Sequence, residues 1–160
     1  MGGHGSAAEE LLTRGADMST TDAKGRTLLH LAVESRSSQM VILLLNRGAA
    51  MSAQDHGGKT VLHLAAEKGI QMMIKLLIDQ GAETSPVDRY GRTPLHLSAQ
   101  LGYGEATKLL VDGGALISAV DSSGRTARDV AEEKGSARAI KALDGESPAG
   151  YVFEDRLILL

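Results

Sequence analysis

At 160 residues the chain is long enough for one compact domain or a short solenoid, and its 42% hydrophobic but only 2% aromatic content requires a core of aliphatic side chains. The formal net charge of −3 gives no basic field for nucleic acid, and no apolar run approaches the ~20 residues that span a membrane. Cysteine is absent, which excludes disulfides and thiolate sites and favours an intracellular protein, cytoplasmic or nuclear.

Two segments come before the regular part of the chain. Residues 1–5 are Gly-rich and lack an apolar stretch, and we interpret them as a leader left from expression. Residues 6–21 match only the second half of the unit that follows, so a first helix is missing where the leader begins. We interpret the chain as a piece of a longer array, and a natural half-repeat cap is the alternative.

A 33-residue period organises the chain from residue 22 onward. It is carried by an Asp that is followed by Gly three residues later and by Thr five residues later, at Asp22, Asp55, Asp88 and Asp121. A fixed period of this length indicates stacked units, because one helix pair cannot bury its own apolar face and needs neighbours. We therefore predict an all-α solenoid of helix-turn-helix units with projecting turns.

Each unit predicts a turn followed by two helices. The D-x-x-G segment is typical of a turn, the Thr is placed to cap a helix, and Pro94 fits the first helical position. The first helices are expected near residues 27–35, 60–68, 93–101 and 126–134, and the second near 39–46, 72–79, 105–112 and 136–143. A Gly at 69, 102 and 135 ends three of the first helices in the left-handed conformation. Arg36 stands there in the first unit and should strain its turn by roughly 1 kcal/mol.

The third unit carries the clearest family signature. Its segment DRYGRTPLHLSAQLGYGEATKLLVDGGA resembles the ankyrin repeat almost position for position, and the T-P-L-H box within a 33-residue period is specific for that family. The resemblance extends over a domain at 6–145, with the half-repeat at 6–21, full repeats at 22–54, 55–87 and 88–120, and a terminal repeat at 121–145. Leu28 and Val61 replace the usual Pro, and Asp129 replaces the His.

The resemblance implies a function as well as a fold. Ankyrin repeats act as non-enzymatic modules that bind a partner protein through a concave face of turn tips and first helices, without a cofactor. The alternative is an architectural spacer segment of a larger ankyrin scaffold that has no ligand of its own. Neither interpretation involves nucleic acid or a membrane.

Two patterns look like chemical sites and have structural explanations. The histidines at 30, 63 and 96 cannot share a metal, because stacked units set equivalent residues ~10 Å apart and Zn–N bonds are ~2.1 Å long. We expect each to hydrogen-bond within its own turn and to tether the next unit. The segment HGGKT at 56–60 lacks the first Gly of a phosphate-binding loop and is the second unit's turn. We therefore assign no catalytic or metal-binding residue.

The candidate binding residues lie on the turns and first helices. Equivalent positions in the four turns carry Arg26, Lys59, Arg92 and Arg125, which we call the basic row, and it favours a partner with acidic residues. Exposed aromatic, Arg and apolar residues dominate interfaces, and the third unit gathers most of them. The candidate set is Arg26, Lys59, Lys68, Arg89, Tyr90, Arg92, Leu101 and Tyr103. Alternatively, Leu101 and Tyr103 seal the junction to the fourth unit.

The apolar residues outside the repeat pattern prompt two further expectations. Ile42 and Met72 align with Lys or other charged residues in the neighbouring units, so we expect both to be exposed on the second helices. The tail at 146–160 holds Phe153 and ends in leucines, so it either folds back on the last helix pair or docks on a partner or a second copy through 151–160. A weak acidic di-leucine sorting pattern at its end is the third alternative.

Overall fold

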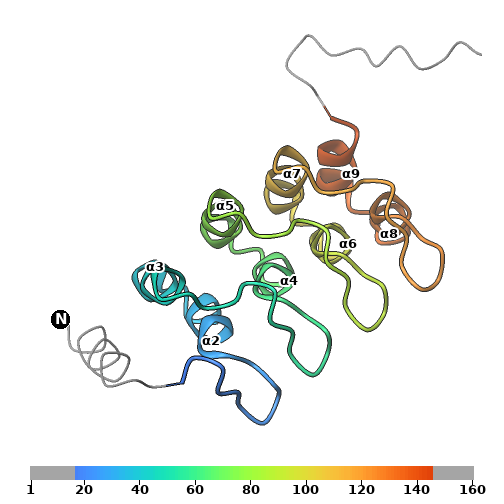
Figure 1. The fold of residues 1–160 in the computed structure, drawn as a ribbon. Coiled ribbons are helices and arrows are strands. Elements are labelled where there is room, and N and C mark those ends of the chain that lie inside the picture. Colours follow the sequence, from blue (N-terminus) through green and yellow to red (C-terminus); the bar gives the residue numbers. More distant parts are fainter. Residues whose placement is uncertain (1–16, 146–160) are drawn as a thin grey trace, which may run out of the picture.

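The computed structural model describes residues 17–145 and shows a row of helix pairs (Figure 1). The helices are α2 (Leu28–Glu34), α3 (Ser38–Asn46), α4 (Val61–Glu67), α5 (Gln71–Asp79), α6 (Pro94–Gln100), α7 (Gly104–Asp112), α8 (Ala127–Glu133) and α9 (Ala137–Leu143). Every predicted helix is present, with each end within one residue of its expected position. Residues 17–145 contain no strand beyond two isolated bridges, so the all-α prediction is confirmed.

The helices form two layers. In Figure 1, α2, α4, α6 and α8 lie in one row and α3, α5, α7 and α9 in the other, and the turns project from the side of the first row. Each first helix packs on the first helix of the next unit, as α4 does on α6, and α7 packs in the same way on α5 and α9 in the other row. Every helix also packs on its own pair partner. This is the repeating contact of a solenoid, in which each unit is stabilised by its neighbours.

The core between the units is aliphatic, as the composition requires. Met73, Ile74 and Leu77 of α5 are fully buried, and so are Leu95 of α6 and Leu110 of α7. Burial of one such side chain is worth ~1.5–3 kcal/mol. The stacked helices therefore hold the array together without large aromatic residues in the core.

The second helices expose the two apolar residues that the alignment of units singles out. Ile42 is 43% exposed and Met72 is 59% exposed, which confirms the predicted register. Their positions carry Lys, Glu or Arg elsewhere in the array.

The bends between the first and second helices confirm the expected left-handed residues. Gly69, Gly102 and Gly135 have φ values of 61°, 72° and 64°. Arg36 has a φ of 58° and is the one non-Gly residue with positive φ among those that the structure describes. The strain expected at this turn is therefore present in the backbone.

Buried histidines connect successive units, as predicted. His63 Nδ1 lies 3.2 Å from the backbone N–H of Thr60, which donates to it. The proton is therefore on Nε2, which donates to the carbonyl of Arg92 in the next unit at 2.9 Å. His30 and His96 make the same contacts with Lys59 and Arg125. Each tether fixes the base of the next turn.

Several predictions concern residues outside 17–145. The leader at 1–5, most of the half-repeat at 6–21 and the tail at 146–160 lie outside the described residues. The proposals that the tail folds back, docks on a partner or mediates self-association stay predictions.

Candidate partner-binding face

The turn tips form a connected edge of the array. The N–H of Arg89 donates to the carbonyl of Gly57 at 3.0 Å, and the N–H of Ser122 donates to the carbonyl of Tyr90 at 2.9 Å. Gly58 makes the first contact possible, because a Cβ there would lie 2.9 Å from the nitrogen of Arg89. The tips are therefore fixed relative to one another by contacts within the chain.

Each turn is built around its Asp. In the third unit, Asp88 Oδ1 accepts from the N–H groups of Tyr90 at 2.8 Å and Arg92 at 3.0 Å, and Oδ2 accepts from the Arg92 guanidinium. Burial raises the pKa of Asp121, but hydrogen bonds from the Arg125 side chain and backbone outweigh it and lower the pKa to about 2. The pKa of Asp88 is lowered as well, and both carboxylates are ionised acceptors within their turns at neutral pH.

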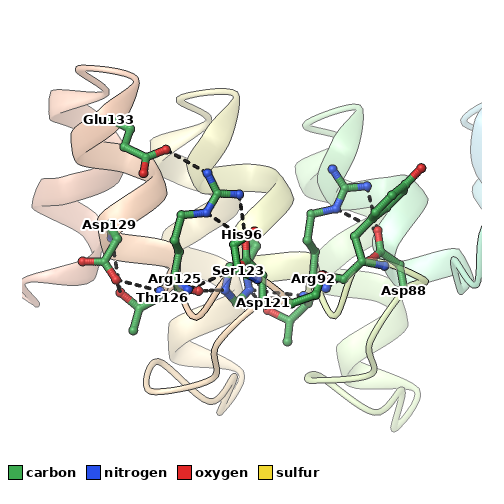
Figure 2. Close-up of polar contacts among 12 residues, drawn as sticks. Asp88, Arg92, His96, Asp121, Ser123, Arg125, Thr126, Asp129 and Glu133 are labelled. Carbon is green, nitrogen blue, oxygen red and sulfur yellow. Dashed lines mark hydrogen bonds and ion pairs between the residues drawn. The ribbon is translucent and has the colours of Figure 1, made fainter.

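The basic row is largely neutralised within the chain. Arg26 Nη1 lies 2.5 Å from Glu34 Oε2, and Lys59 Nζ lies 2.7 Å from Glu67 Oε1. In the fourth unit, Arg125 bonds both Asp121 and a glutamate on α8, Glu133 (Figure 2). Three of the four basic side chains thus bridge to the end of their own first helix. The row is not a continuous basic surface.

Arg92 is the member of the row that differs. The residue eight positions later is Gln100, whereas it is Glu in the other three units. Figure 2 shows Arg92 bound to Asp88, and its guanidinium also stacks on the Tyr90 ring with 4.8 Å between the guanidinium carbon and the ring centroid. A cation stacked on an aromatic face in this way is held in place by about 0.5–1 kcal/mol at an exposed site.

The third unit also exposes apolar side chains on this face. Tyr90 is 63% exposed and Leu101 is 48% exposed. Leu101 occupies the position of Lys68, which reaches back to Glu34 of the preceding unit at 3.1 Å between Nζ and Oε1. The third unit therefore has an apolar residue at the position through which the second unit forms an ion pair with the first unit.

Tyr103 lies apart from the other candidates. It immediately precedes α7, and its ring packs on Gly69, where a Cβ would lie 2.9 Å from the ring. With residues of α7 and α9 it lines a hollow of about 700 Å³. Its packing contact is thus with the second unit, whereas the alternative interpretation assigned it to the junction with the fourth. The structure brings Tyr90 and Arg92 into contact and places Tyr103 beyond the other end of α6.

One residue was missing from the candidate set. Gln100 is half-buried and precedes Leu101 in the chain, and it aligns with Glu34, Glu67 and Glu133 at the 33-residue period. A comparison of equivalent positions for charge, in addition to apolar character, finds it. Within residues 17–145, no group of His, Asp and Glu is arranged to hold a metal ion.

Stacked helix pairs, tethered by buried histidines and joined through their turn tips, define a repeat solenoid. Residues 1–88 and 72–148 each match the family model for ankyrin repeats in three copies. The chain therefore belongs to the ankyrin-repeat family, whose members are generally protein–protein interaction modules and typically have no enzymatic activity. No curated protein matches the chain. None of the helices between residues 17 and 145 is long and apolar enough to cross a membrane.

Proposed function

We propose that this protein binds a partner protein through the face formed by the turn tips and first helices, with the centre of the interface on the third unit. The observation that carries the proposal is the pair of exposed apolar side chains, Tyr90 and Leu101, beside an Arg92 that the aromatic ring and Asp88 hold in place. Interface energy concentrates in a few aromatic, Arg and apolar residues surrounded by a polar rim.

The remaining candidates have supporting roles in this proposal. Arg89 adds a positive charge at the turn tip of the third unit. The rim of the interface is formed by Arg26, Lys59 and Lys68, whose ion pairs within the chain leave little positive charge to attract a partner. Rim charges mainly influence the association rate, because solvent screens them. Tyr103 contributes only where a partner reaches past the end of α6.

The test compares exposed apolar residues on the two sides of the array. Y90A and L101A remove side chains from the proposed face, while M72A and I42A remove side chains of similar exposure from the second helices. Capture of a partner from a cell lysate is quantified by mass spectrometry. We expect Y90A and L101A each to weaken the partner's affinity by more than about 1 kcal/mol and so to reduce the amount captured. M72A and I42A should leave it unchanged. All four variants should keep nearly the same melting temperature.

The alternative function gives a different outcome. If the chain is an architectural spacer without a ligand, none of the four substitutions changes what is captured. If Y90A and L101A unfold the array while the folded fraction binds normally, these side chains are packing residues and the proposed interface is wrong.

A further inference from the structure

The ion-pair pattern along the basic row has one gap. In the first, second and fourth units a glutamate at the end of the first helix accepts from the basic side chain of its own turn. In the third unit, Nε and Nη2 of Arg92 both donate to Asp88 Oδ2, and Nη1 has no acceptor among the described residues. The Gln100 side chain likewise has no hydrogen-bond partner within residues 17–145. One carboxylate is missing from an otherwise repeated network.

The count of charged residues in the third unit also indicates a missing carboxylate. Residues 88–101 contain two arginines and a single carboxylate, whereas each matching segment of the other units has at least as many carboxylates as Lys and Arg residues. The excess positive charge therefore lies at Arg89 and Arg92, beside the exposed Tyr90 ring.

The surroundings favour an external carboxylate over water. Arg92 is already oriented by Asp88 and by stacking on Tyr90, so little side-chain entropy is lost when it binds a ligand. A hydrogen bond from a guanidinium to a carboxylate is about twice as strong as a neutral one, and the Gln100 amide can donate a second. Leu101 follows Gln100 in the chain and is 48% exposed, so it offers an apolar contact to a neighbouring side chain of the partner.

We propose that the partner protein supplies this carboxylate, as an Asp or Glu side chain adjacent to an apolar residue, and that it binds Arg92 Nη1 and the Gln100 amide. The partner's carboxylate then occupies the place that Glu34, Glu67 and Glu133 fill in the other units. This inference rests on the proposed function, because it specifies the chemistry recognised by the same face.

The test uses Gln100→Glu, which supplies the missing carboxylate from within the chain. The matched control is Glu133→Gln, which removes the equivalent carboxylate from the fourth unit. Peptides of twelve residues are selected from a random phage-displayed library on the wild-type protein. Their dissociation constants are measured by fluorescence polarisation against wild type, Q100E, E133Q, R92A, Y90A and L101A.

We expect the peptides that Y90A weakens to contain an Asp or Glu next to an apolar residue. Exchange of that residue for Asn or Gln, and Q100E in the protein, should each weaken binding at least tenfold, whereas E133Q should change it less than twofold. In R92A the acid-to-amide exchange in the peptide should have little further effect, because the same contact is already lost.

Each other outcome overturns a defined part of the account. If Y90A weakens binding but Q100E and the acid-to-amide exchange change it less than twofold, the carboxylate inference is wrong and the proposed function stands. If R92A weakens acidic peptides and Q100E does not, the carboxylate binds elsewhere on Arg92 and this site is wrong. If no selected peptide responds to Y90A or L101A, both the inference and the proposed function fail.

Discussion

The substitution Arg36→Gly should stabilise the array, because Arg36 is held at a φ of 58° in a bend where the other units have Gly. The backbone conformation is required by the turn, since the N–H of Arg36 donates to the Val33 carbonyl and that of Ser37 to the Ala32 carbonyl. The Arg36 side chain is exposed and forms no hydrogen bond or ion pair with the residues that the structure describes, so its removal sacrifices no native contact.

The expected gain follows from two opposing contributions. A residue with a Cβ pays roughly 1–2 kcal/mol in the left-handed region. Glycine opposes this gain by about 0.4–1 kcal/mol, because it increases the conformational entropy of the unfolded chain. We therefore expect R36G to raise the free energy of unfolding by about 0.5–1 kcal/mol, measured by urea denaturation followed by circular dichroism.

Gly135→Ala is the matched opposite change. Gly135 has a φ of 64°, and a Cβ added there would meet no atom within 4 Å, so the cost of this substitution is conformational and not steric. The same two contributions apply with opposite sign, so we expect G135A to lower the free energy of unfolding by about 0.5–1 kcal/mol. The reasoning is refuted if G135A has this effect while R36G leaves stability unchanged or lowers it, because positive φ at residue 36 would then carry no cost.

Three other predictions follow from the packing, the buried histidines and the tail. Gly69→Ala should destabilise by at least about 2 kcal/mol, since the new Cβ would meet the Tyr103 ring at 2.9 Å in a left-handed residue, and Tyr103→Ala in the same chain should recover the steric part. Burial lowers the pKa of His30 and His63 from about 6.5, so the stability they provide is complete above that pH and declines as the pH falls below it. The urea midpoint of unfolding should therefore decrease as the pH is lowered from 7.5 to 5.5. A constant midpoint would contradict the conclusion that His30 and His63 are neutral when they tether the next unit. Deletion of 148–160 should lower the melting temperature or abolish self-association measured by light scattering, and no change in either would refute both ordered interpretations of the tail.

The repeat period explains why so much of the fold could be predicted. Equivalent residues occupy the same local environment in every unit, so helix ends, the left-handed Arg36 and the histidine tethers follow from alignment of the chain with itself. The exposure of Ile42 and Met72 follows in the same way, because charged residues take their place in other units.

The details of the candidate face could not be predicted in the same way. The ion pair between Arg26 and Glu34 joins residues eight apart on a turn and a helix end, and the pair between Lys68 and Glu34 joins different units. Such contacts depend on side-chain reach across a folded surface, which periodicity does not reveal. The sequence therefore predicts a basic row, and the structure shows that each member is ion-paired within the chain and that Arg92 alone lacks the glutamate from the end of its first helix.

The most direct test of the central claim is site-specific photo-crosslinking in the cell. Benzoylphenylalanine is placed at position 90 in one variant and at position 72 in another, which are 63% and 59% exposed on the two sides of the array. Interaction through the turn face of the third unit predicts a discrete adduct with a partner protein from position 90 and none from position 72. Equal adducts from both positions, or an adduct from position 72 alone, would contradict the account.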